Sequence, residues 1–186
     1  AEHGLMDSAR AAFERSLTLD EAFPEAHLQM AQVYFTEGHL DKSARSYERA
    51  VRIQPWLAGG HYNLGNLLLA KGNLSGAVER FERALRLNPN FAMAHNNLAQ
   101  AKEGLGQWDE AMAGYRSALE IDAEQPQAWF NLANLLESTG ALREAGPAYL
   151  RAHELIVSSE EYGDNGQYRV FAQRALAAAN RLGSGR

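Results

Sequence analysis

A unit of 34 residues recurs along this chain, and that recurrence constrains the fold more than any other feature. The segment that begins at Gly60 lines up with the segment that begins at Ala94, so that His61 and His95 are 34 residues apart. The same step forward reaches Trp129, and the same step back reaches His27. Self-similarity at a fixed period of this length is typical of repeat proteins, in which each unit packs on its neighbours.

The period predicts how the chain is divided. Before the first full unit, Ala9, Phe13 and Ser16 occupy second-helix positions and Gly4 falls on a turn position, which indicates a partial repeat. We interpret this as a hypothesis that the chain is part of a longer array or of a larger protein. An amphipathic pattern over residues 167–182 predicts a helix that caps the array. The predicted segments are a partial repeat with a second helix only (1–23), four repeats (24–57, 58–91, 92–125 and 126–159), and a linker with a C-terminal capping helix (160–186).

Each repeat is predicted to contain two helices joined by a tight turn. The first helix carries apolar residues at helical spacing, such as Leu64 and Leu68. A glycine follows in every repeat, and glycine tolerates the positive φ that ends many helices. The second helix carries a small, an aromatic and a small residue, and side chains two places before the first small residue are expected to cap it. The turn glycines are Gly38, Gly72, Gly106 and Gly140, and the expected caps are Asp41, Ser75 and Asp109. In the fourth repeat Pro147 predicts an irregular helix start.

One repeat carries a recognisable set of residues: His61, Leu64, Gly65, Ala77, Phe81, Ala84 and Pro89. This set resembles the tetratricopeptide repeat signature, and the resemblance covers residues 24–159. It implies an all-α fold, a right-handed superhelical solenoid of antiparallel helix pairs. It also implies that the first helices line a concave groove.

Composition excludes several classes of function. The net charge of −5 argues against a nucleic-acid partner, because phosphate binding relies on an excess of Lys and Arg. Apolar runs such as Leu67 to Ala70 are too short for membrane insertion. No phosphate-binding loop, nucleophile elbow or zinc-protease motif is present, so we expect no enzyme activity and no cofactor.

The histidine series His27, His61 and His95 invites a metal-binding interpretation. Ligands of one metal ion lie about 2 Å from it, whereas stacked helices are roughly 8–10 Å apart. Three histidines in successive repeats therefore cannot share one ion. Trp129 occupies the fourth equivalent position, which indicates packing between helices, so we expect no metal site.

Carboxamide side chains recur at two positions of the first helix, three residues apart and therefore on one helix face. A carboxamide has donors and an acceptor, so a row of them can pair with the backbone of an extended peptide. The pattern resembles the asparagine ladder in the repeat region of O-linked N-acetylglucosamine transferases, which implies peptide binding. Structural hydrogen bonds within the array are the alternative. The first amide series is Gln29, Asn63, Asn97 and Asn131, and the second amide series is Gln32, Asn66, Gln100 and Asn134.

Neighbouring residues extend the predicted peptide-binding groove. Leu28, Tyr62 and Phe130 share one repeat position, interrupted by Asn96, and offer apolar contacts. Glu103 and Glu137 lie toward the ends of their first helices. These two carboxylates either favour a basic ligand or face solvent.

We therefore predict a protein-interaction scaffold that binds an extended segment of a protein or peptide partner. One alternative is the substrate-recruiting repeat region of a larger enzyme, such as a glycosyl- or sulfotransferase. A second alternative is self-association through the open N-terminal helix. The sequence predicts a soluble protein and does not distinguish a cytoplasmic from a periplasmic location.

Overall fold

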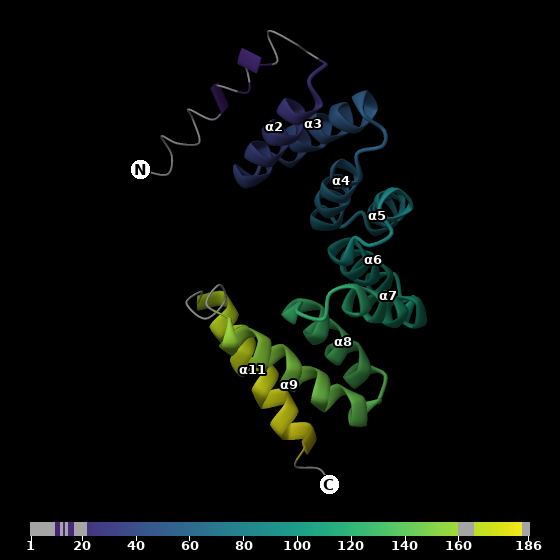
Figure 1. The fold of residues 1–186 in the computed structure, drawn as a ribbon, viewed down its shortest axis with the longest axis vertical. Helices are drawn as coiled ribbons and strands as arrows, with labels where there is room; N and C mark the ends of the chain where they lie inside the picture. The colour runs from purple at the N-terminus through teal and green to yellow at the C-terminus, as the bar shows by residue number, and fades with distance from the viewer. Residues whose placement is uncertain (1–9, 12, 14, 17–21, 160–165, 184–186) are drawn as a thin grey trace. The chain divides into compact units, whose positions relative to one another are not determined.

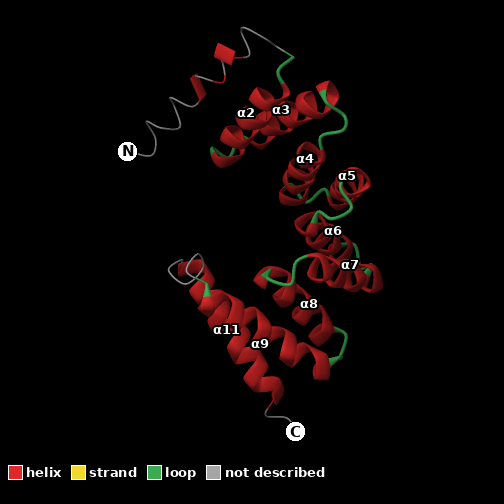
Figure 2. Cartoon of the chain, in the orientation of Figure 1, coloured by secondary structure: helices red, strands yellow, loops and turns green. Residues whose placement is uncertain are grey.

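The structure, a computed structural model, describes residues 10, 11, 13, 15, 16, 22–159 and 166–183. Within these residues the chain forms helices joined by short turns, with no strand (Figure 2). The predictions for Gly4, Ala9 and most of the linker, residues 160–165, lie outside the described residues.

The described helices α2 to α9 follow one another along the chain as four pairs, and α11 comes after the last pair (Figure 1). The first helices of the pairs are α2 (Pro24–Thr36), α4 (Ala58–Ala70), α6 (Ala92–Gly104) and α8 (Pro126–Ser138). The second helices are α3 (Leu40–Ile53), α5 (Leu74–Leu87), α7 (Trp108–Ile121) and α9 (Leu142–Ser158). Both sets start at intervals of 34 residues, and each first helix packs on the second helix of its own pair. The last helix, α11 (Gly166–Gly183), packs against α9.

The predicted positive φ of the turn glycines is confirmed. The φ angles of Gly38, Gly72, Gly106 and Gly140 are 77°, 76°, 77° and 82°. In the second pair the Gly72 amide donates to the Leu69 carbonyl, and the next amide donates to Leu68. These bonds close the end of the first helix and reverse the chain within three residues.

The predicted helix caps are wrong by two positions. The second helices begin directly after the residue that follows each glycine, so Asp41 and Asp109 lie in the first turn instead. Carboxylates in the first turn still interact favourably with the positive end of the helix dipole. Asn73 is the one cap of the four pairs whose side chain bonds to the helix, because its Oδ1 accepts from the Gly76 amide at 3.0 Å. The residues at the cap position are His39, Asn73, Gln107 and Ala141.

The last second helix starts differently from the other three, because its Glu144 amide donates to the Ala141 carbonyl at 3.1 Å, but the proline does not interrupt it. The helix α9 runs from Leu142 to Ser158 with Pro147 inside it. The proline side chain is exposed, so its ring displaces no core residue.

The core is built from the small–aromatic–small pattern of the second helices. Phe81 and Tyr115 are fully buried, and alanines flank both of them. The aromatic side chain leaves little room on the facing first helix. A methyl group added at Gly65 would lie 2.6 Å from the Phe81 ring, so glycine is required at this close approach.

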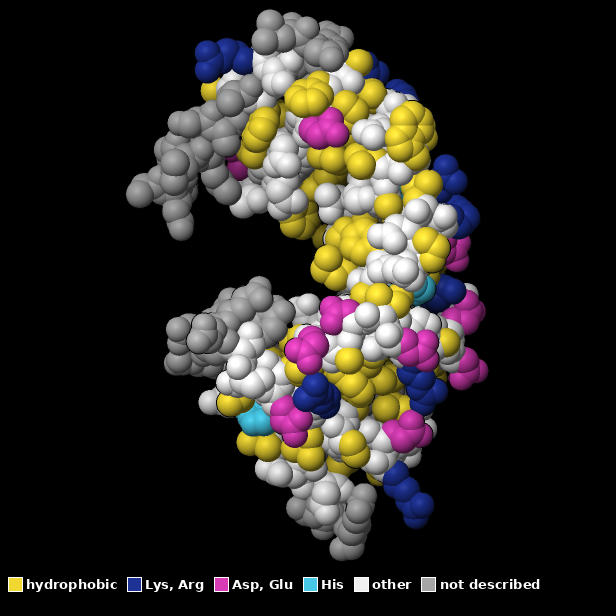
Figure 3. Space-filling model, viewed as in Figure 1, with side chains coloured by type: hydrophobic (Ala, Val, Ile, Leu, Met, Phe, Trp, Pro, Cys, Tyr) yellow, Lys and Arg dark blue, Asp and Glu magenta, His cyan; other side chains and the backbone are white. Residues whose placement is uncertain are grey.

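The chain packs as two compact units, which we call unit 1 (Ala1–Pro89) and unit 2 (Asn90–Arg186). Unit 1 contains α2–α5, and unit 2 contains α6–α9 and α11. The sequence of unit 1 has ten basic and eleven acidic residues, whereas that of unit 2 has eight basic and twelve acidic residues. Figure 3 shows acidic side chains gathered over unit 2 on the face in view. The excess negative charge of the chain therefore lies mainly in unit 2.

Candidate functional site

The two amide series lie on the first helices, and their exposure differs. Half-buried members are Asn63, Asn66, Asn97 and Asn131, and exposed members are Gln29, Gln32, Gln100 and Asn134. Solvent therefore reaches every member, at least in part. Asn63 has no hydrogen-bond partner among the residues that the structure describes, whereas several other members do.

A third amide links two members of the first series in unit 2. Asn96 is only 7% exposed, and its Nδ2 donates to Asn97 Oδ1 at 2.9 Å. Its Oδ1 accepts from Asn131 Nδ2 at 3.3 Å, so the link crosses from α6 to α8. The sequence showed Asn96 only as an interruption of the apolar series. The structure shows that it fixes the amides of two successive repeats.

Tyrosine hydroxyls on the second helices hold two members of the second amide series, Gln32 and Asn134. The Tyr47 hydroxyl donates to Gln32 Oε1 at 3.0 Å. The Tyr149 hydroxyl lies 2.6 Å from Asn134 Oδ1 and 2.8 Å from Glu137 Oε2, so its single hydrogen serves two acceptors. In both amides the oxygen faces the tyrosine, and the NH₂ group remains as the donor for other partners.

Burial raises the pKa of these hydroxyls further above neutral pH. It raises the pKa of Tyr47, and it raises the pKa of Tyr149 further with the help of the Glu137 carboxylate. The pKa of Tyr115 is raised in the same way, first by burial and then by its bond to Glu103. A tyrosine hydroxyl is already protonated at neutral pH, and these shifts keep all three hydroxyls as donors in alkaline solution as well.

Two carboxylates continue the helix face in unit 2. Glu103 Oε2 accepts from the Tyr115 hydroxyl at 2.7 Å. Glu137 accepts from Tyr149 and also pairs with Arg181 of α11. Neither carboxylate simply faces solvent, which was one of the two alternatives. The equivalent positions in unit 1 carry Phe35, which is 36% exposed, and Leu69.

The predicted apolar positions are partly used by the core. Leu28 packs against a cluster that contains Tyr47 and Leu64. The Tyr62 ring centroid lies 6.0 Å from that of Phe81, and the Phe130 centroid lies 5.5 Å from that of Tyr149. All three side chains are half-buried, so each combines a packing contact with a surface that a ligand can reach.

In two repeats, those of His61 and Trp129, the residue at the histidine position packs between helices. His61 is 5% exposed, and its Nε2 lies 3.1 Å from the Pro55 carbonyl oxygen. Trp129 donates from Nε1 to the equivalent carbonyl, that of Ala123, at 2.8 Å. Burial lowers the pKa of His61. Across the described part of the chain, no group of three or more His, Cys, Asp or Glu residues is arranged to hold a metal ion.

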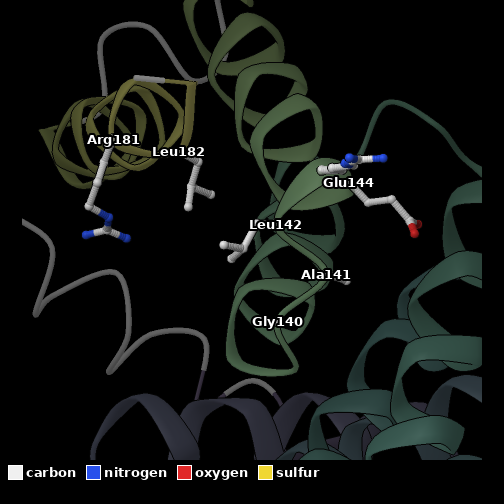
Figure 4. A pocket seen from close by; sticks show the side chains of 7 residues that line it. Gly140, Ala141, Leu142, Glu144, Arg181 and Leu182 are labelled. Carbon is white, nitrogen blue, oxygen red and sulfur yellow. The ribbon is translucent and has the colours of Figure 1, made fainter. Parts of the chain in front are cut away.

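Two depressions in unit 2 are not lined by residues of the amide series. The first has a volume of about 1090 Å³ and lies where the α8–α9 turn meets the end of α11. There Leu142 and Leu182 point toward one another, and Glu144 points away from α11 (Figure 4). The second, of about 790 Å³, lies between α7, α8 and α9. Its apolar floor includes Leu132 and Leu136.

No helix among the described residues combines the length and the apolar character needed to cross a membrane.

Known solved structures share this fold. A thermophilic TPR protein from Thermus thermophilus is 27% identical, with a TM-score of 0.73, over 95% of this chain and 93% of that chain. MamA from Desulfovibrio magneticus is 18% identical, with a TM-score of 0.76, over 86% of this chain and 90% of that chain. YrrB, described as a TPR protein with an unusual peptide-binding site, is 19% identical, with a TM-score of 0.68, over 92% of each chain. The predicted all-α fold of repeated helix pairs is confirmed.

Comparison with protein families agrees with the structural similarity. No curated protein sequence matches the chain. A profile of the tetratricopeptide repeat matches residues 62–126 and 104–156, more than half of the chain. A second profile, described as TPR repeat, matches residues 31–72. The predicted resemblance is confirmed at the level of the family, and the chain belongs to the tetratricopeptide repeat family.

Proposed function

We propose that this protein is a non-catalytic interaction scaffold that binds an extended segment of a partner protein along the first helices of its repeats. The observation that carries the proposal is the fixed orientation of four amides of the two series: Gln32, Asn97, Asn131 and Asn134. Tyr47 and Tyr149 turn the oxygens of Gln32 and Asn134 inward, and Asn96 links Asn97 to Asn131.

The chemistry of this face suits a peptide backbone. Amide NH₂ groups on successive repeats offer donors to backbone carbonyls, and these contacts depend little on the side chains of the partner. Leu28, Tyr62 and Phe130 are half-buried beside the amides and add apolar contacts. The structural similarity to YrrB, which is described as having a peptide-binding site, supports the same class of ligand.

The alternative, in which the amides only form hydrogen bonds within the array, can be distinguished from peptide binding by experiment. If the amides serve only the fold, their removal changes stability and leaves binding intact. Asn97 and Asn131 do have internal partners, so their replacement is expected to change both properties. A test therefore needs a variant that spares the Asn96 link.

The first experiment selects peptides from a displayed library on the full chain and measures their affinities. We expect replacement of Asn63, Asn97 and Asn131 together by Ala to lower the affinity for the selected peptides by about 100-fold. Each lost hydrogen bond contributes roughly 1 kcal/mol to the binding free energy. The second variant replaces the exposed amides Gln29, Gln100 and Asn134 by Ala. It leaves Asn96 and both of its partners in place.

The matched control removes two exposed amides outside the first helices, Gln107 and Gln173. It is expected to bind like the original chain. Circular dichroism shows whether each variant is folded. Unchanged affinity in both folded amide variants would rule out the proposed function. Recruitment of substrates to a larger enzyme and self-association remain predictions.

A further inference from the structure

Near the end of unit 2, a carboxylate already binds a basic side chain of the same chain. Arg181 comes from α11 and pairs with Oε1 of Glu137 on α8. The other oxygen of that carboxylate, Oε2, accepts from the Tyr149 hydroxyl at 2.8 Å. The Tyr149 hydroxyl, which Asn134 shares, therefore contacts one oxygen of the carboxylate, and the guanidinium binds the other.

The same carboxylate–tyrosine pair occurs one repeat earlier. Glu103 Oε2 accepts from the Tyr115 hydroxyl at 2.7 Å, and Tyr115 is fully buried. Among the described residues, no basic side chain pairs with Glu103. The adjacent Lys102 is held by Glu110 at 2.6 Å, and Arg116 on α7 is held by Glu144 at 3.0 Å.

We propose that Glu103, held by Tyr115, binds an arginine side chain of the partner segment in the way that Glu137 binds Arg181. This inference rests on the proposed peptide-binding function and specifies its ligand. A guanidinium presents several N–H donors in a fixed plane, which matches a carboxylate better than an ammonium does.

The position of Glu103 suits a side chain of a bound peptide. Asn97, Gln100 and Glu103 follow one another at intervals of three residues on α6, so each is adjacent to the next on the surface of the helix. A backbone held by the two amides passes close to the carboxylate. The acidic excess of unit 2 also attracts basic segments before they bind.

The site is expected in unit 2 alone. The positions equivalent to Glu103 in unit 1 carry Phe35 and Leu69, which favour apolar side chains. In the repeat of Leu69, Phe81 also stands in the place of the tyrosine and offers no hydroxyl. The two units thus differ in the side chains that they select.

The experiment compares peptides selected from one displayed library on the full chain, on Glu103→Gln and on Glu120→Gln. Glutamine keeps the shape of the side chain and can still accept from Tyr115, but it has no charge. Glu120 is exposed on α7, so its variant makes the same change in net charge away from the site. We expect arginine at one peptide position to be enriched about tenfold on the original chain and on Glu120→Gln, and not on Glu103→Gln.

Synthetic peptides then isolate the charge. A selected peptide and its citrulline counterpart, which has the same shape without the charge, are titrated against each protein. We expect the original chain to bind the arginine peptide about tenfold more tightly than the citrulline peptide. We expect Glu103→Gln to bind the two peptides equally tightly. Tyr115→Phe is expected to reduce the preference, because the carboxylate loses its fixed orientation.

The outcomes separate this inference from the proposed function. Arginine enrichment that persists on Glu103→Gln, or that disappears equally on Glu120→Gln, overturns the arginine site. Peptides that bind the groove with no arginine preference also overturn it and leave the proposed function standing. A library that yields no bound peptide overturns both.

Discussion

His61 and Trp129 occupy the same position in different repeats and contact equivalent carbonyls. His61 Nε2 lies 3.1 Å from Pro55 O, and Trp129 Nε1 lies 2.8 Å from Ala123 O. A carbonyl only accepts, so Nε2 of His61 carries the hydrogen and Nδ1 carries none. Nδ1 is buried without a partner among the described residues, and protonation there would place an unpaired charge in the core.

This arrangement predicts how stability depends on pH. Burial lowers the pKa of His61 in the folded state, and the charges of Arg80, Arg83 and Arg86 act in the same direction. The unfolded chain therefore binds a proton more readily near the ordinary pKa of about 6.5. The stabilisation is complete above that pH and decreases as the pH falls toward the lowered pKa, by up to about 1.4 kcal/mol per unit.

The measurement is denaturant unfolding of the original chain and of His61→Trp at pH 7.5 and pH 5. Tryptophan keeps the donor to the carbonyl and has no proton to gain. We expect the loss of stability at pH 5 to be smaller in His61→Trp than in the original chain. The same loss in both proteins would exclude His61 as a cause of the pH dependence.

For individual residues, the sequence predicted the helix face on which a side chain lies better than its hydrogen-bond partners. It placed the amides on one helix face because that face follows from helical spacing alone. It missed the role of Asn96, whose bonds to Asn97 and Asn131 depend on rotamers and on how closely α6 and α8 approach. The one available signal was a polar side chain in an otherwise apolar series.

The turns between paired helices depend on four glycines in a backbone region that other residues avoid. The φ of Gly72 is 76°, and nothing lies within 4 Å of the place where a Cβ would stand. A substitution there strains the backbone without any steric clash. Gly59 also has nothing within 4 Å of a Cβ, but it lies inside α4.

These two glycines form a matched pair for a test. We expect Gly72→Ala to destabilise the protein by about 1–2 kcal/mol, because a left-handed conformation disfavours a side chain. We expect Gly59→Ala to stabilise it by up to about 1 kcal/mol, because alanine has less backbone entropy to lose in a helix. Denaturant unfolding measures both changes. Equal effects of the two substitutions would contradict the backbone explanation.

The helices and their turns were predictable because each repeat restates the same pattern. The cap positions were not, because Asp41 and Asp109 have the chemistry of caps and lie two residues past them. The positive φ of the glycine reverses the chain at once, so the helix starts sooner than the cap residues indicate. The division into repeat segments remains a prediction.

The two compact units give the whole molecule more than one core. Phe81 is fully buried in unit 1, and Tyr115 is fully buried in unit 2. Loss of a large buried aromatic side chain typically costs about 3–5 kcal/mol. Repeat proteins distribute such a loss locally, because each repeat depends on its neighbours.

We expect Phe81→Ala to reduce hydrogen-exchange protection in α4 and α5 much more than in α8 and α9. Tyr115→Ala is expected to do the reverse, with the largest loss in α6 and α7. Hydrogen exchange followed by mass spectrometry resolves these segments. A uniform loss of protection over both units, in either variant, would show that the molecule unfolds as a single cooperative body. The sequence predicted the repeat fold but not this division, since the repeat pattern itself continues across residues 89 and 90.

The internal bonds of the amides have a consequence for the thermodynamics of recognition. A long polar side chain normally loses rotamer freedom when it grips a ligand, at about 0.5–1.5 kcal/mol each. Gln32, Asn97, Asn131 and Asn134 have already lost much of that freedom, because Tyr47, Asn96 and Tyr149 hold them in the folded chain. Under the proposed function the surface is therefore preorganised in these repeats, and the backbone of a bound peptide would meet donors whose orientation is already fixed. Asn63, which lacks such a partner among the described residues, is left as the adaptable position of the first amide series.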